Sequence, residues 1–248
     1  MRLAVAGATG GVGKHVADVA RERGHEVVEL TRAAGVDLTT GSGLAGRLDG
    51  VAAVVDTTNV MTQKRSEAEA FFGSVTRQLL AAEKIAGVGH HLALSIVGID
   101  GSASGYYAGK RLQERLLADG DVPWTVLRAT QFHEFAEQML GFASLGRLSV
   151  VPVMQSQPVA AREVGEALID LVEAGPAGRA PDLAGPEVLR MDRAARQVNR
   201  ARNLGRWIVP VRVPGAAGAE MRSGKLLPSD AGPRGQMTFE EWLGVTAR

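Results

Sequence analysis

The chain has 248 residues, of which 45% are apolar and 22% are charged, with a formal net charge of +1. This composition is typical of a globular protein with a sizeable core, and the small charge predicts neither nucleic acid nor a membrane surface as partner. The chain has no cysteine, which excludes disulfides, thiolate metal sites and a cysteine nucleophile and agrees with a predicted cytoplasmic location. No apolar run approaches the roughly 20 residues that span a bilayer, and the first residues lack the apolar stretch of a signal peptide.

The first half of the chain predicts strands that alternate with helices. Buried-type apolar runs predict strands at residues 2–6, 25–31, 51–56, 92–97 and 124–127. Helices are predicted at residues 12–23, 66–86 and 106–118, the second of them opened by a capping box at Ser66–Glu69. This alternation indicates βαβ units, and so an α/β fold with a doubly wound parallel sheet.

The pattern is less regular after Arg128. Helices are predicted at residues 131–145, 162–173 and 191–202, strands at 148–153 and 206–213, and a loop at 214–233. A second capping box, Thr238–Glu241, predicts a short last helix. We therefore divide the chain into a first domain, residues 1–130, and a smaller lobe, residues 131–248, that is interleaved with it and closes over a substrate.

A glycine-rich turn links the first strand to the first helix, with the sequence GATGGVG from Gly7 to Gly13. In this setting the first glycine allows a tight turn, the second lets a pyrophosphate approach the backbone, and the third lets helix and strand pack closely. The helix N-terminus presents free N–H groups to the phosphates. The motif predicts a dinucleotide-binding Rossmann domain, rather than an ordinary strand–helix turn, with these binding residues: Gly7, Thr9, Gly10, Gly11, Val12 and Gly13.

The end of the second strand, Leu30-Thr31-Arg32, bears on the choice between NAD and NADP. Proteins that bind NAD place an acidic residue here for the ribose 2′-hydroxyl, whereas arginine suits a 2′-phosphate. Thr31 occupies the usual acidic position and Arg32 follows it, so we predict NADP, with NADPH preferred over NADH. Glu29 lies within the strand, and a solvated surface role for Arg32 remains the alternative. Asp37 and Leu38 are predicted to lie near the adenine.

These motifs, together with Ser95 and the segment Tyr106–Lys110, resemble the short-chain dehydrogenase/reductase superfamily. The form of the glycine turn, and the segments at 126–132 and 183–187, are similar to its atypical, NmrA-like branch. The resemblance implies a nicotinamide cofactor at the C-terminal edge of the sheet, with the substrate beyond it. It also implies that Thr57, Thr58 and Asn59 pass near the cofactor and that Ser95 lies near the nicotinamide.

Tyr106 and Lys110 are four residues apart, and so share one face of a helix. In the superfamily this spacing marks a catalytic pair. Lysine holds the nicotinamide ribose and lowers the tyrosine pKa, tyrosine donates a proton to a carbonyl, and a serine, here Ser95, orients that carbonyl. The alternatives are an exposed Lys110–Glu114 pair and Tyr107 as the proton donor.

Other polar groups are assigned as follows. Gln131, Phe132 and His133 follow the fifth strand, where ligands bind in such sheets, and are predicted to contact the substrate. His133 could instead cap the following helix. We interpret His90-His91 as part of a loop and predict no metal site. The arginine-rich stretch 190–206 is read as a solvated helix face rather than a nucleic-acid contact.

Three hypotheses follow from this pattern. The first is an NADPH-dependent oxidoreductase that reduces a small carbonyl or enone-like substrate. The second is a regulator that binds the dinucleotide without chemistry, suggested by the short spacing of 11 residues between Ser95 and Tyr106. The third is an epimerase or dehydratase that recycles bound NAD. The partner in each case is a small molecule, and a homodimer is left open.

Overall fold

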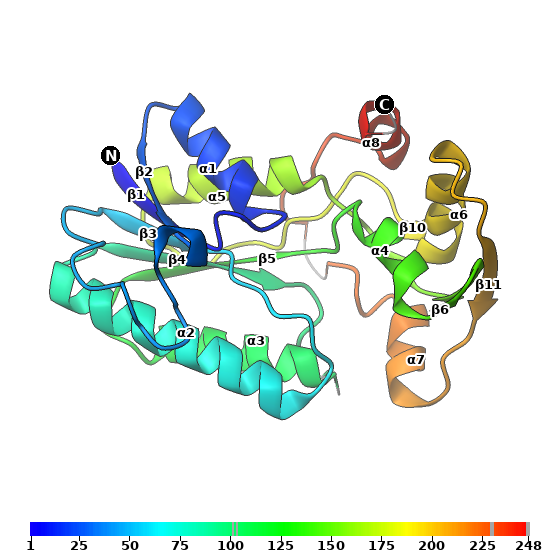
Figure 1. Cartoon of the computed structure of the whole chain (residues 1–248), viewed down its shortest axis with the longest axis horizontal. Coiled ribbons are helices and arrows are strands. Elements are labelled where there is room, and N and C mark those ends of the chain that lie inside the picture. The colour runs from blue at the N-terminus through cyan, green and yellow to red at the C-terminus, as the bar shows by residue number, and fades with distance from the viewer. Residues whose placement is uncertain (101, 103, 229–230, 247–248) are drawn as a thin grey trace. The chain divides into compact units, whose positions relative to one another are not determined.

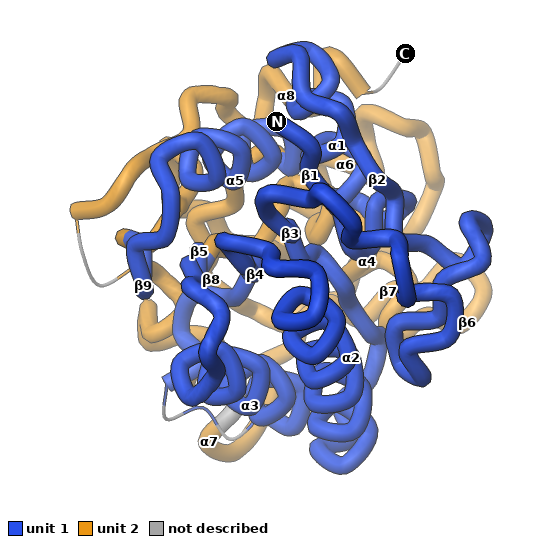
Figure 2. Tube along the Cα trace, turned by 90° about the vertical axis from the view of Figure 1, so that its left-hand side faces the viewer, with its two compact units in different colours: residues 1–128, 161–180 blue, residues 129–160, 181–248 orange. Residues whose placement is uncertain are grey.

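The computed structural model describes the whole chain except residues 101, 103, 229, 230, 247 and 248. It divides the chain into two compact units (Figure 2). The first comprises residues 1–128 and 161–180, and the second comprises residues 129–160 and 181–248. Residues 161–180 belong to the first unit, although the division expected from the sequence assigned them to the smaller lobe, residues 131–248.

A six-stranded sheet forms the centre of the first unit, in the order β2-β1-β3-β4-β5-β9. Its strands are β1 (Arg2–Ala6), β2 (Glu26–Leu30), β3 (Ala53–Asp56), β4 (His90–Ile96), β5 (Trp124–Ala129) and β9 (Gly178–Arg179). The pairs β1–β2, β1–β3, β3–β4 and β5–β9 are parallel. The predicted α/β fold with a parallel sheet is confirmed.

Helices cover both faces of this sheet. Helices α1 (Gly13–Glu22) and α5 (Ala161–Ala174) lie on one face, and α2 (Arg65–Ala86) and α3 (Gly105–Ala118) lie on the other (Figure 1). Because both faces are covered, β1 and β3 are buried along almost their whole length, which explains why both read as continuous apolar runs.

The second unit has two small sheets and four helices among its described residues. A three-stranded sheet has the order β11-β7-β6, and β8 pairs with β10. The strands are β6 (Ser144–Leu145), β7 (Leu148–Pro152), β8 (Gln155–Ser156), β10 (Leu189–Arg190) and β11 (Trp207–Val211). The helices are α4 (Phe135–Phe142), α6 (Met191–Ala201), α7 (Gly215–Arg222) and α8 (Phe239–Thr246).

The two predicted capping boxes have different outcomes. At α8 the Thr238 N–H donates to Glu241 Oε2 at 2.8 Å and the Glu241 N–H donates to Thr238 Oγ1 at 3.3 Å, so this box is confirmed. The box at Ser66 is wrong, because α2 begins one residue earlier and its N-cap, Lys64, makes no side-chain cap. Thr62 Oγ1 instead accepts the Lys64 N–H at 3.1 Å, so the chain is fixed just before the helix.

Three further segments of the chain have a different secondary structure from the one expected. The predicted loop 214–233 contains α7, whose alanines and Glu220 favour helix; positions 229 and 230 lie outside the described residues. The predicted helix 131–145 is confined to Phe135–Phe142, because Phe132 forms a β-bridge with Val159 and residues 144–145 form β6. His90 and His91 are not in a loop but begin β4, and both are buried.

No helix among the described residues combines the length and the apolar character that a membrane crossing requires.

Candidate dinucleotide-binding site

The glycine-rich turn packs against the loop that follows β3. Gly7 has a φ of +78°, and the Gly10 N–H donates to its carbonyl at 2.8 Å. A Cβ at position 13 would lie 2.1 Å from the Gly7 oxygen and 2.7 Å from Thr57 Oγ1. Since the nearest obstacle is backbone, only glycine fits where α1 begins.

Backbone donors are left over at this turn. Val12 is the N-cap of α1 and provides no side-chain cap. Among the described residues, the N–H groups of Gly11, Val12 and Gly13 have no hydrogen-bond acceptor, and the first helical N–H with one is that of Lys14. A Cβ at Gly11 would meet nothing within 4 Å. Unpaired N–H groups at an open helix N-terminus are suited to phosphate oxygens, so these residues fit a dinucleotide.

The loop after β3 is fixed on both sides. The Thr57 N–H and hydroxyl both donate to the Ala6 carbonyl, at 3.0 and 2.8 Å. The Thr58 N–H donates to Asp56 Oδ1 at 2.8 Å, and Asn59 Oδ1 accepts the Tyr106 hydroxyl at 2.6 Å. The structure thus places Thr57 beside the glycine turn and joins Asn59 to α3.

The end of β2 carries Arg32 on an exposed position. Thr31 is buried, and its hydroxyl accepts the Ala34 N–H at 3.2 Å, capping the 3₁₀ turn Arg32–Ala34. The Glu29 carboxylate is paired with Arg21 of α1 at 2.5 Å. The acidic residue that complicated the cofactor prediction is therefore already engaged, and Arg32 is the charged side chain at the tip of the strand.

The residues predicted near the adenine have different environments. Asp37 Oδ1 accepts hydrogen bonds from the Thr39 N–H and hydroxyl, at 2.9 and 2.6 Å. These bonds, with a smaller contribution from the Arg32 charge, lower the pKa of Asp37. Leu38 is buried among the apolar side chains of the first unit. The Asp37 carboxylate thus holds the conformation of this loop through its two hydrogen bonds from Thr39.

Lys110 lies in the interior rather than on the surface, so the exposed Lys110–Glu114 pair is wrong. Its side chain is among the buried groups, and Nζ donates to the Leu94 carbonyl and to Gln113 Oε1, both at 2.9 Å. Nζ also lies 4.3 Å from the centroid of the Phe72 ring. Burial lowers the pKa of Lys110 to about 8, although Asp56 and Glu114 favour the charged form.

A chain of hydrogen bonds runs from Lys110 to the loop after β3. Gln113 Nε2 donates to Asp56 Oδ2 at 2.8 Å, and Asp56 Oδ1 accepts the Thr58 N–H. Asp56 and Gln113 are both completely buried. The sequence pattern singled out neither residue. The available signals were a carboxylate at the end of a buried strand and a glutamine three positions after Lys110.

Tyr106 and Ser95 have separate hydrogen-bond partners. The Tyr106 ring packs edge-on against Phe72, with centroids 5.7 Å apart, and its hydroxyl is bonded to Asn59. Burial raises the pKa of Tyr106 rather than lowering it, and the Lys110 charge is not among the causes. The Ser95 hydroxyl donates to Glu114 Oε1 at 2.5 Å, and Glu114 is paired with Arg128 at 2.6 Å.

In the second unit, the predicted substrate residues are held by their neighbours. Gln131 Oε1 accepts the Ser156 hydroxyl at 2.5 Å. His133 is completely buried, with its ring near those of Phe239 and Trp242. Nε2 of His133 lies 3.1 Å from the Met237 carbonyl oxygen. Its side chain therefore does not cap α4, whose N-cap is Glu134. Among the described residues, no group of three or more metal-ligating side chains gathers.

The parallel sheet with its glycine turn defines the first unit as a Rossmann fold. Neither a family model nor a curated protein sequence matches the chain. Solved structures do match over its whole length, at sequence identities that show the fold alone. UDP-glucose 4-epimerase from Thermotoga maritima, with UDP-glucose, is 14% identical with a TM-score of 0.74, covering 100% of this chain and 97% of that one.

Two further similar structures contain a nicotinamide dinucleotide. An NADPH-dependent quinone oxidoreductase from Escherichia coli, complexed with NADPH, is 17% identical with a TM-score of 0.71, covering 99% of this chain and 100% of that one. A short-chain dehydrogenase/reductase superfamily protein from Agrobacterium tumefaciens, with bound NAD, is 18% identical with a TM-score of 0.70, covering 100% and 96%.

Substitution of Gly13 by alanine tests the packing of the turn. Because the new Cβ would meet the Gly7 carbonyl at 2.1 Å, we expect Gly13→Ala to lower the free energy of unfolding by about 1–3 kcal/mol. The matched control is Gly11→Ala, whose Cβ meets open space and which should change stability by less than about 0.5 kcal/mol. Urea unfolding of both variants measures the difference, and equal stabilities would contradict this packing.

The buried amine of Lys110 predicts a pH dependence of stability. The folded pKa of about 8 lies below the ordinary lysine pKa of 10.5, so between these values the unfolded chain binds more protons on this group. Stability contributed by this group therefore rises with pH, by up to about 1.4 kcal/mol per unit. Urea unfolding between about pH 7.5 and 10 should show the wild type gaining stability relative to Lys110→Met. A constant difference would show that the amine is not desolvated.

Proposed function

We propose that the chain binds a nicotinamide dinucleotide at the turn Gly7–Gly13 and works as an NADPH-dependent oxidoreductase on a small carbonyl or enone-like substrate. The observation that carries the proposal is the set of unpaired N–H groups of Gly11, Val12 and Gly13 at the start of α1. The dinucleotides in the similar quinone oxidoreductase and superfamily protein support the same cofactor class. We also propose that the chain is related to the NmrA-like branch, which its sequence motifs resemble.

Arg32 supports NADPH rather than NADH. Arg32 directly follows Thr31 after β2, and Glu29 within that strand is paired with Arg21. A guanidinium forms strong paired hydrogen bonds with phosphate oxygens. Arg32 thus binds the 2′-phosphate. Thr31, whose hydroxyl caps the following turn, has no carboxylate that could bind the ribose 2′-hydroxyl of NAD.

The proposed chemistry divides between cofactor and side chains. When bound, the nicotinamide supplies the hydride. Tyr106 donates the proton through its hydroxyl, which is now bonded to Asn59 Oδ1; the raised pKa of this hydroxyl keeps it protonated near neutral pH. Lys110 uses two of its three N–H donors on Leu94 and Gln113. Nζ also lies over the Phe72 ring; in this proposal a ribose hydroxyl replaces that ring contact at the third donor, and the Gln113–Asp56 bond connects the amine to the loop after β3.

A dinucleotide-sensing regulator is the second candidate. It is favoured by the arrangement of Ser95, whose hydroxyl is bonded to Glu114 and not to Tyr106 or Lys110. A site with this arrangement can bind a dinucleotide without orienting a carbonyl. The third hypothesis, an epimerase that recycles NAD, is supported by the fold shared with UDP-glucose 4-epimerase.

Loss of the Arg32 charge should change cofactor preference. Charge-assisted bonds to phosphate contribute about 1.5–3 kcal/mol, so Arg32→Ala should raise the Kd for NADPH by roughly 10- to 100-fold and leave the Kd for NADH unchanged. The control is Arg65→Ala, which removes an exposed arginine paired with Glu69 on α2. Calorimetric titration with both nucleotides gives the four constants. Equal losses for NADPH and NADH would refute the assignment.

Turnover separates the candidate functions. With NADPH and a panel of ketones, quinones and enones, Tyr106→Phe should lower kcat by roughly 100- to 10,000-fold while NADPH still binds. Tyr107→Phe, the adjacent phenol, should retain the wild-type rate. Binding of NADPH with no consumption by the wild type on any substrate would favour the regulator. Dinucleotide that co-purifies and is never consumed would favour the epimerase.

A further inference from the structure

The loop that joins β2 to β3 carries a second arginine, Arg47, next to the turn that bears Arg32. Nη2 of Arg47 donates to the Ala34 carbonyl oxygen at 2.7 Å. Ala34 is the last residue of the 3₁₀ turn Arg32–Ala34. The guanidinium group of Arg47 therefore lies against the same short turn that begins with Arg32, although the two arginines are far apart in the sequence.

A close backbone contact within the loop brings these two segments together. Gly43 has a φ of +74°, and a Cβ at this position would lie 2.0 Å from the Gly35 carbonyl oxygen. Since that obstacle is backbone, only glycine lets the chain return so close to the end of the turn. Asp37 and Ser42 form an antiparallel bridge in the same loop. The returning chain is thus held against the segment that bears Arg32.

The backbone of Arg47 is anchored by two leucines. Leu44 and Leu48 are buried and belong to the apolar cluster beneath the loop. The Arg47 N–H donates to the Leu44 carbonyl oxygen at 3.1 Å, which closes a turn between the two leucines. Arg47 itself is exposed. Its backbone is therefore fixed by the core, while its side chain reaches back to Ala34 and keeps its remaining N–H groups accessible.

A carboxylate near Arg32 makes a second positive charge useful here. The hydrogen bonds from Thr39, with a smaller contribution from the Arg32 charge, lower the pKa of Asp37, so this carboxylate is ionised at neutral pH. A phosphate bound by Arg32 alone would therefore meet a negative charge close by. The Ala34 carbonyl that Arg47 binds is neutral. Arg47 thus brings a second guanidinium group to the turn, which offsets the repulsion from Asp37.

We infer that Arg47 binds the 2′-phosphate of NADPH together with Arg32, and so is a second residue that determines cofactor specificity. This inference rests on the proposed dinucleotide site. A guanidinium group has five N–H donors in a fixed fork, of which the bond to Ala34 uses one. The remaining donors can bind phosphate oxygens, which guanidinium groups do in pairs. NADH has a hydroxyl in place of this phosphate and gains nothing from the second charge.

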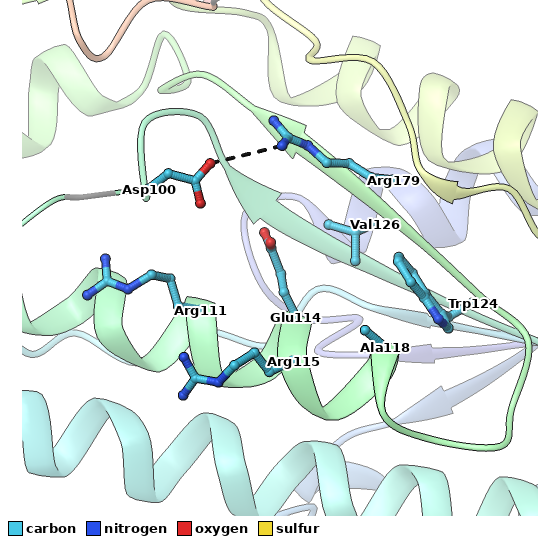
Figure 3. A pocket seen from close by; sticks show the side chains of 8 residues that line it. All are labelled: Asp100, Arg111, Glu114, Arg115, Ala118, Trp124, Val126 and Arg179. Atoms are coloured by element: carbon cyan, nitrogen blue, oxygen red, sulfur yellow. Dashed lines mark ion pairs between the residues drawn. The ribbon is translucent and has the colours of Figure 1, made fainter.

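The test is calorimetric titration of the full chain and its variants with NADPH and NADH. Arg47→Ala should raise the Kd for NADPH about tenfold or more and leave the Kd for NADH unchanged. Arg47→Gln, whose amide can still donate to the Ala34 carbonyl but carries no charge, should show the same selective loss. The matched control is Arg115→Ala, which removes an exposed arginine of α3 beside the hollow at β5 (Figure 3) and should change neither Kd.

A fragment of the cofactor isolates the phosphate from the nicotinamide. Adenosine 2′,5′-bisphosphate carries the 2′-phosphate, and adenosine 5′-monophosphate lacks it. Arg47→Ala should weaken binding of the bisphosphate about tenfold and leave binding of the monophosphate unchanged. Circular dichroism of each variant checks its fold.

The outcomes separate this inference from the proposed function. Selective loss of NADPH binding in Arg32→Ala but not in Arg47→Ala would overturn the inference and leave the proposed cofactor in place. Equal losses for NADPH and NADH in Arg47→Ala would show that this side chain only holds the turn, and would also overturn it. If the wild type binds neither nucleotide, the inference and the proposed function fail together. Selective loss without turnover of any substrate would support the inference and contradict only the oxidoreductase activity.

Discussion

The close approach of Gly13 to the Gly7 carbonyl is the constraint on which the candidate site depends. Only a residue without a Cβ lets α1 begin directly at the turn, because a Cβ at position 13 would lie 2.1 Å from the Gly7 oxygen. That distance is far shorter than any real contact between these atoms. This approach leaves the N–H groups of Gly11 and Val12 without acceptors. It also brings Thr57 against the turn, where both its N–H and hydroxyl bind the Ala6 carbonyl. One packing contact thus sets the donors and one wall of the site.

A second constraint is electrostatic and lies inside the first unit. Lys110 is surrounded by protein, and its amine is held by a backbone carbonyl, a glutamine and the face of Phe72. Through Gln113 the amine is linked to Asp56, and Asp56 in turn fixes the loop after β3. The same helix, α3, therefore positions the loop from two sides, since Tyr106 binds Asn59 near its start. Burying an amine lowers its pKa, so the contribution of Lys110 to the stability of the first unit rises as the pH increases above about 8.

The next turn of α3 carries a different charge pattern. Glu114 joins Ser95 to Arg128, and Arg128 also binds Asp100. These ion pairs hold Glu114 where it accepts the hydroxyl of Ser95, near the end of β4. One network thus accounts for the hydrogen-bond partner of Ser95.

The sequence by itself determined the strand–helix alternation, the glycine turn and the position of Arg32, because these depend on local periodicity and on short motifs. It also determined the last helix, whose capping box uses only Thr238 and Glu241. Only the tertiary structure decided that Lys110 is buried and that Ser95 faces Glu114, and only there did Asp56 and Gln113 emerge. These depend on partners 16 to 57 positions apart in the chain, whose distances no local pattern encodes. The sequence also failed to predict α7, because the glycines and prolines around it are typical of a loop. It failed to predict that His90 and His91 lie in a buried strand, because histidine is a polar residue.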